Sequence, residues 1–204
     1  MATVIMDRSL AAELKRERAV SGADRWDEVW EGTYMMAPLP NIEHQQIVNR
    51  LAAIFQETVG WDGQDIVLPG TNVSDREKGW EHNYRCPDVV VYLEGTKAKN
   101  CDTHWMGGPD LAVEIVSDDD LTRDKVPFYA AVATRELLII DREPWALELR
   151  RLSDGELKLI GTVTEGSGHS LGSDVLPLSF KLIGGKSRTM IEVVRATDGK
   201  TWFV

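Results

Sequence analysis

The segment that most constrains the fold is the apolar run at residues 110–117, DLAVEIVS. Its nearly continuous apolar content is typical of a strand at the centre of a buried sheet. Residues 121–133 then have apolar side chains at helical spacing, and residues 136–141, ELLIID, predict a further strand. Hydrophobic residues form 43% of the 204 residues, which is enough for one buried core. We therefore predict a single mixed α/β domain.

The remaining segments extend this prediction in both directions along the chain. Asn41 caps a predicted helix that runs to Gly60. We expect strands within 25–39, 64–69, 86–93 and 176–183, loops at 71–83 and 94–108, and a helix at 8–20. Two hairpins are expected, around Asp154-Gly155 and Asp198-Gly199. We divide the domain into an N-terminal helical appendage (1–24), a core (25–163) and a C-terminal extension (164–204).

Charge and cysteine content exclude several classes of protein. Two cysteines, Cys86 and Cys101, argue against a disulfide framework. No segment has the apolar length of a membrane span or a secretory signal, so we expect a cytoplasmic protein without membrane contact. The 23 Lys and Arg against 33 Asp and Glu give a net charge of −10. Because proteins that grip duplex nucleic acid are usually basic, a nucleic-acid function needs local basic surface or a divalent metal.

Three ionisable residues occupy positions where the periodicity predicts core. Glu114 shares its strand face with Ala112 and Val116, and Asp88 opens the apolar run of the strand at 86–93. Lys125 falls on the apolar stripe of the helix at 121–133. Buried carboxylates need partners, so these residues require one another or a cation.

Two interpretations follow from this pattern. In the first, Asp88 and Glu114 supply hard oxygen ligands to Mg²⁺ or Mn²⁺, and the Lys125 ammonium stabilises developing negative charge. This interpretation requires both carboxylates to converge within bridging distance of one ion, in a cleft open to solvent, and it is wrong if the two side chains project to opposite faces of the sheet. In the second, the three residues form a buried ion pair with a structural role.

The ordered set of motifs resembles a known family. Its parts are Glu28-Val-Trp-Glu-Gly32, His44, Pro87-Asp88, residues 108–117 (GPDLAVEIVS), Asp124-Lys125 with Tyr129, and Glu136-Leu-Leu-Ile-Ile-Asp141. Together they resemble the Uma-type putative restriction endonuclease family of the PD-(D/E)XK nuclease superfamily, from about Trp26 to about Gly161.

The resemblance implies a restriction-endonuclease-like fold in which a central mixed β-sheet is flanked by helices, with β-hairpins added. It also implies that Asp88 and Glu114 bind the metal and that Lys125 completes the site. The superfamily usually places the lysine two residues after the acid, where this chain has Val116. The resemblance suggests that the lysine has moved to the next helix. Pro127 is compatible with that helix only if it lies in the first turn.

Other candidate residues are less specific. His44 points inward from its helix and is either a core histidine or a residue that supports the active site. Glu28 lies either near the metal or on the surface. A further set could in principle bind zinc: His82, Cys86, Cys101 and His104.

The predicted function is a magnesium-dependent or manganese-dependent endonuclease that hydrolyses DNA. Basic residues in the two predicted loops are candidate DNA contacts: Arg76, Lys78, Arg85, Lys97 and Lys99. Cutting both strands calls for a homodimer, for which an apolar patch is available: Trp26, Trp30, Tyr34 and Met36. The alternative is a catalytically inactive nuclease-like fold that serves as an interaction or dimerisation module.

Overall fold

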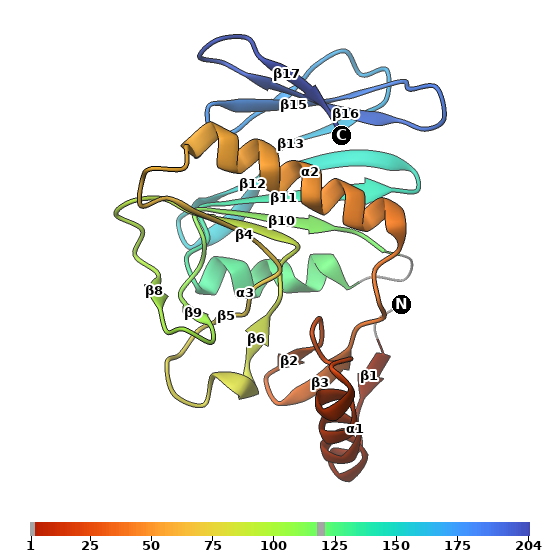
Figure 1. Ribbon diagram of the computed structural model, residues 1–204, viewed down its shortest axis with the longest axis vertical. Helices are drawn as coiled ribbons and strands as arrows, with labels where there is room; N and C mark the ends of the chain where they lie inside the picture. The colour runs from red at the N-terminus through yellow and green to blue at the C-terminus, as the bar shows by residue number, and fades with distance from the viewer. Residues whose placement is uncertain (1–2, 118–120) are drawn as a thin grey trace.

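The centre of the protein is a six-stranded mixed sheet in the order β13-β12-β11-β10-β7-β4 (Figure 1). The computed structural model describes residues 3–117 and 121–204. The strands of this sheet are β4 (Ile66–Pro69), β7 (Val89–Tyr92), β10 (Leu111–Ile115), β11 (Glu136–Arg142), β12 (Trp145–Ser153) and β13 (Glu156–Thr164). β10 and β11 pair in parallel, whereas the other neighbours pair antiparallel. The predicted mixed α/β architecture is confirmed.

Helix α2 (Ile42–Val59) covers one face of this sheet. Asn41 caps it, because the Asn41 side chain accepts the His44 N–H at 2.9 Å. Its buried side chains recur at helical spacing: His44, Ile47, Val48, Leu51, Ile54 and Phe55. The helix predicted between Asn41 and Gly60 is therefore confirmed.

The opposite face of the sheet is covered by α3 (Val126–Ala131), which follows the 3₁₀ turn η2 (Thr122–Lys125). Side chains of β10 alternate between the faces: Leu111, Val113 and Ile115 belong to the core cluster of α2, and Ala112 packs with α3. The helix predicted at 121–133 is shorter and begins as a 3₁₀ turn. Pro127 lies in the first turn of α3, where backbone N–H groups have no intrahelical partner.

A four-stranded C-terminal sheet lies beside α2 on the same side of the central sheet (Figure 1). Its strands are β14 (Leu171–Gly172), β15 (Leu178–Ile183), β16 (Met190–Arg195) and β17 (Thr201–Phe203). Phe180 is fully buried and meets Phe55 of α2 edge-on, with ring centroids 6.2 Å apart. The C-terminal sheet thus shares one core with α2 and the central sheet.

The third sheet consists of short strands from the N-terminal half of the chain, in the order β1-β3-β2-β6-β5-β9-β8. Its elements are β1 (Thr3–Ile5), β2 (Glu28–Trp30), β3 (Thr33–Met36), β5 (Val73–Ser74), β6 (Tyr84–Arg85), β8 (Lys99–Asn100) and β9 (Trp105–Met106). Helix α1 (Arg8–Ser21) and the 3₁₀ turn η1 (Trp80–His82) are attached to it. Four two-residue strands lie at 73–106, mostly within the predicted loops, because strands this short have no detectable apolar period. Residues 1–2 of the predicted appendage lie outside the described residues.

Residues of the proposed dimer patch make contacts within their own chain. Tyr34 is 3% exposed, and its hydroxyl donates to Asp27. Met36 packs against the small cluster around Val29, and the Trp30 ring lies against the Arg85 guanidinium. Tyr34 is therefore not available for an interface, whereas Trp26, Trp30 and Met36 are only partly buried, so the remainder of the patch stays a prediction.

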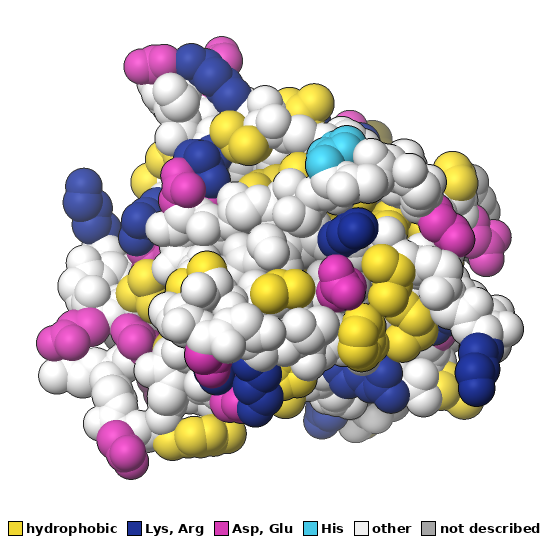
Figure 2. All heavy atoms as spheres, turned by 90° about the horizontal axis from the view of Figure 1, so that it is seen from above, with side chains coloured by type: hydrophobic (Ala, Val, Ile, Leu, Met, Phe, Trp, Pro, Cys, Tyr) yellow, Lys and Arg dark blue, Asp and Glu magenta, His cyan; other side chains and the backbone are white. Residues whose placement is uncertain are grey.

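The described part of the chain contains no helix that is both long and apolar enough to cross a membrane. Lys and Arg side chains are interspersed with Asp and Glu on the face of the molecule shown in Figure 2. That face therefore presents no continuous basic band for a nucleic-acid backbone.

Candidate active site

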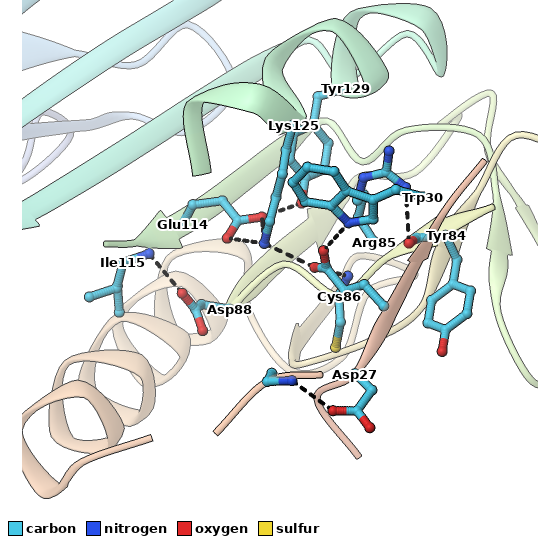
Figure 3. Close-up of polar contacts among 12 residues, drawn as sticks. Asp27, Trp30, Tyr84, Arg85, Cys86, Asp88, Glu114, Ile115, Lys125 and Tyr129 are labelled. Carbon is cyan, nitrogen blue, oxygen red and sulfur yellow. Dashed lines mark hydrogen bonds and ion pairs between the residues drawn. The ribbon is translucent and has the colours of Figure 1, made fainter. Parts of the chain in front are cut away.

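A pocket of about 260 Å³ opens where β7 and β10 of the central sheet meet the small N-terminal sheet. Six ionisable residues discussed above line it: Glu28, His44, Cys86, Asp88, Glu114 and Lys125. Asp88, directly before β7, and Glu114 of β10 thus line one cleft, whereas the bridging of one ion by their carboxylates stays a prediction (Figure 3).

Asp88 is placed by the pairing of β7 with β10. Val89 pairs with Val113, so Asp88 lies opposite Glu114 at the next position of the antiparallel ladder. The Asp88 carboxylate accepts the Ile115 N–H at 2.7 Å, and its other oxygen lies 2.7 Å from Nε2 of His44. Both carboxylate oxygens are thus fixed before any ligand arrives, and His44 has a supporting contact at the site.

Glu114 is 3% exposed and has two direct partners from the α3 side of the sheet. Lys125 Nζ lies 3.0 Å and 3.2 Å from its two oxygens, and the Tyr129 hydroxyl donates to the same carboxylate (Figure 3). The 3₁₀ turn places Lys125 one helical turn before Tyr129, so both side chains reach the same carboxylate. The lysine expected after the second acid is thus present beside Glu114, although it comes from η2 rather than from β10. Val116, at the usual lysine position, packs in the core cluster of α3.

Glu28 completes the group from β2. It is 6% exposed, and its carboxylate accepts from Lys125 Nζ at 2.9 Å, from the Cys86 N–H at 2.9 Å and from Trp30 Nε1 at 2.6 Å. Glu28 is thus inside the site rather than on the surface. Tyr129 was not predicted as a site residue, although its position four residues after Lys125 on one helix face is a usable signal.

The electrostatics of the pocket are dominated by excess negative charge. Burial raises the pKa of Glu114 to about 8, and the carboxylates of Asp88 and Glu28 add to this effect, whereas the Lys125 ammonium opposes it. Burial likewise raises the pKa of the Cys86 thiol well above its ordinary range. Lys125 pairs with two of the three carboxylates, Glu28 and Glu114, and Arg142 also lines the pocket, so the carboxylates outnumber these cations by one.

The donor set fits a small hard cation. Asp88 and Glu114 offer carboxylate oxygens, and Mg²⁺ is commonly held by one or two carboxylates while it keeps several waters. Among the described residues, no group of three or more His, Cys, Asp or Glu side chains is arranged to hold a metal ion. A metal ion here would therefore have at most these two carboxylates as ligands and would keep most of its waters.

The zinc site considered from the sequence is also wrong, because its four residues do not come together in the described chain. His104 stacks on Trp80 at 4.8 Å between ring centroids, and the Cys101 thiol lies against the Lys99 carbonyl. Cys86 lies in the pocket with Glu28. The four proposed zinc ligands do not form a tetrahedral set within the described chain.

The predicted DNA contacts lie outside the pocket. Arg85 is 5% exposed, with its guanidinium 4.5 Å from the Trp30 ring and 4.2 Å from the Phe128 ring. Arg85 is thus a buried packing residue, and the prediction that it contacts DNA is wrong.

Exposed cations remain at the other four positions. Arg76 pairs with Asp75 at 2.7 Å, and Lys99 pairs with Glu77 at 2.7 Å. Lys78 and Lys97 are also exposed. The two ion pairs reduce the positive potential of this surface, so a contribution from it to DNA binding stays a prediction.

Comparisons with known proteins agree with the fold. The family model Uma2, described as "Putative restriction endonuclease", matches residues 20–183. The crystal structure of a putative nuclease belonging to DUF820 from Anabaena variabilis ATCC 29413 is similar, with a TM-score of 0.58 and 15% sequence identity. That similarity covers 73% of this chain and 82% of the other. A search of curated proteins gave no match.

The family match includes every residue of the pocket's charged group, from Glu28 to Lys125. The structural similarity extends the agreement to the arrangement of helices and strands. The chain has the fold of that nuclease and belongs to the Uma2 family of putative restriction endonucleases.

Proposed function

We propose that this protein is a divalent-metal-dependent endonuclease that hydrolyses phosphodiester bonds in DNA. The observation that carries the proposal is that Asp88, Glu114 and Lys125, from three different elements, line one open pocket. A structural ion pair alone does not require a second carboxylate fixed beside it. Membership in the Uma2 family supports the nuclease assignment.

Each residue has a role that follows from its contacts. Asp88 and Glu114 would hold Mg²⁺ or Mn²⁺, which when bound polarises a phosphoryl oxygen and lowers the pKa of a water. His44 holds the Asp88 carboxylate in its orientation through the 2.7 Å contact. Lys125, held by Glu28 and Glu114, presents a positive charge at the pocket and stabilises negative charge that develops on the phosphate.

A second candidate is a catalytically inactive nuclease-like fold that serves as an interaction module. The specific observation in its favour is that Lys125 already pairs with both Glu114 and Glu28. In that case the charged group is a satisfied buried network with no need for a cation.

Glu114→Gln separates the two candidates. The substitution removes one charged ligand and keeps the shape of the side chain. We expect DNA cleavage in Mg²⁺ or Mn²⁺ to fall by at least about a hundredfold, the effect of losing a major electrostatic group. We also expect Mg²⁺ to raise the thermal midpoint of the wild type and to have little effect on the variant.

Glu156→Gln, at an exposed position on β13, is the matched control and should behave as the wild type. Cleavage by Glu114→Gln at the wild-type rate would refute the proposal. So would a wild type that neither cleaves DNA nor responds to Mg²⁺.

Cleavage of both strands would require a second site, so a homodimer stays a prediction. Tyr34 cannot contribute to its interface, because that side chain is buried within the chain. Light scattering that reports only the monomer mass would end this prediction.

A further inference from the structure

Part of the pocket lining is apolar, and we call it the apolar wall. Its six residues come from the chain before β2, from β3 and from the segment between β3 and α2: Trp26, Met35, Ala37, Pro38, Leu39 and Pro40. Hydrolysis of a phosphodiester uses only the charged side of the pocket. The apolar wall therefore calls for a separate explanation.

Within this wall, the Trp26 ring packs closely against the backbone of Gly70. A Cβ at Gly70 would lie 2.1 Å from the Trp26 ring, so only glycine leaves room for the indole there. The Gly70 N–H donates to the Asp88 carbonyl at 3.0 Å. The indole is thus fixed next to the backbone that carries a proposed metal ligand.

The segment at 37–41 is held by a buried ion pair. Asp27 is 2% exposed and pairs with Arg18 of α1 at 2.6 Å. The Asp27 carboxylate accepts the Ala37 N–H at 2.8 Å, and Arg18 Nη2 donates to the Ala37 carbonyl at 3.0 Å. Both backbone groups of Ala37 are therefore clamped, which fixes the segment that forms the apolar wall.

Leu39 stands at the rim of the wall and is 84% exposed although it lines the pocket. Pro38 and Pro40 on either side restrict the backbone, so Leu39 has little freedom to turn inward. A clamped backbone thus presents a large aliphatic side chain to solvent at the mouth of the site.

The chemistry of DNA determines which of its groups could bind to the apolar wall. The backbone of a duplex is charged, and the faces of its bases are covered by stacking. An unpaired base exposes two apolar faces, and stacking of a base on an aromatic side chain is favourable in single-strand binding proteins. The pocket, at about 260 Å³, is smaller than the range of roughly 300–1,000 Å³ common for ligand pockets, so it suits one small planar group.

We infer that the apolar wall formed by Trp26, Met35, Pro38 and Leu39 binds an unstacked base, so that the substrate is single-stranded or locally unpaired DNA. This inference rests on the proposed nuclease function, because the carboxylates would then receive the adjoining phosphate.

Binding in the Glu114→Gln background tests the inference without turnover. The probes are a short fluorescein-labelled DNA strand of mixed sequence, its duplex, the same strand with abasic positions, and the matching RNA strand, each in Mg²⁺ buffer. By fluorescence anisotropy we expect the DNA strand to bind about tenfold more tightly than the duplex. The abasic strand should lose this advantage.

Leu39→Asp, added to that background, should weaken single-strand binding about tenfold and leave duplex binding unchanged. The side chain is largely exposed, so the substitution does not threaten folding. Leu159→Asp on β13, also exposed, is the matched control and should have no effect. Trp26→Ala should reproduce the loss seen with Leu39→Asp.

Equal affinity for strand and duplex, unchanged binding by Leu39→Asp, tighter binding of RNA, or no binding at all would each overturn the inference. Wild-type cleavage in Mg²⁺ is scored separately. Cleavage of duplex as fast as single strand would overturn the base site and leave the nuclease proposal standing. Base-dependent binding without any cleavage would support the base site and refute the nuclease.

Discussion

Glu114 and Glu136 are buried glutamates on neighbouring parallel strands, yet their surroundings differ. In the register of β10 and β11, Glu136 lies opposite Leu111 and Glu114 opposite Ile139. Glu136 is 1% exposed and accepts from Arg151 Nε at 2.9 Å, the Ser173 hydroxyl at 2.5 Å and the Asp174 N–H at 2.9 Å. Its charge is met by several donors, including one arginine.

Glu114 has a less complete set of partners. Its lysine is shared with Glu28, as Arg151 is with Asp174, but Asp88 adds a further carboxylate to the same open pocket. Burial and pairing with a cation are common to both glutamates, so neither marks a functional site. The distinguishing feature is an excess of carboxylates over cations beside an open cavity.

The largest expected effect is a difference in the free energy of unfolding between the Gln variants of the two glutamates. Glu136→Gln weakens the contact with Arg151, which keeps its ion pair with Asp174, and should cost about 2–3 kcal/mol in the free energy of unfolding. Glu114→Gln should retain or increase the stability of the metal-free protein, because Gln is neutral in both states, whereas Glu114 must take up a proton or bury its charge on folding. Urea denaturation at pH 7 in EDTA measures both. An equal loss in the two variants would mean that Glu114 has a structural role.

A second prediction concerns pH. Glu114 has a folded-state pKa of about 8 against an ordinary value of 4.5, so the folded protein holds a proton that the unfolded chain releases. Its contribution to stability is complete below pH 4.5 and is lost as the pH rises toward 8. Between pH 5 and pH 7 the wild type should lose about 2–3 kcal/mol relative to Glu114→Gln in EDTA. Parallel curves for the two proteins would contradict this assignment.

The smallest expected effect comes from the hydroxyl groups that meet each glutamate. Tyr129→Phe should cost about 1 kcal/mol, the usual value of one hydrogen bond. Because the Tyr129 hydrogen bond lowers the pKa of Glu114, its loss should also move the pH-dependent window upward. Ser173→Ala removes a hydroxyl from Glu136 as the control. Denaturation curves of both variants across pH should show a shifted window only for Tyr129→Phe.

The core of the fold and the centre of the site were predictable because both depend on local periodicity. The alternation of β10 placed Glu114 on the face of Ala112, and the apolar stripe at 121–133 placed Lys125 toward the same interior. The Asp154-Gly155 hairpin followed from its turn residues, which adopt φ values of 55° and 80°.

Residues that depend on long-range contacts were not predictable in the same way. Arg85 resembled a solvent-exposed cation because its neighbours in sequence are polar, but β2 and α3 supply the aromatic rings that enclose it. Glu28 became part of the site only through Lys125, 97 residues later in the chain. Two-residue strands likewise arise from tertiary pairing rather than from a local pattern.

The packing of α2 against the C-terminal sheet has a kinetic consequence. The Phe55–Phe180 contact joins segments far apart in sequence, and Arg50 of α2 donates to the carbonyl of Phe203, 153 residues away. Contacts between distant segments form late, because closing a long loop costs conformational entropy before the contact is gained. Chains with many such contacts therefore fold slowly. Because α2 also carries His44, we expect Asp88 to reach its final orientation only in the last steps of folding.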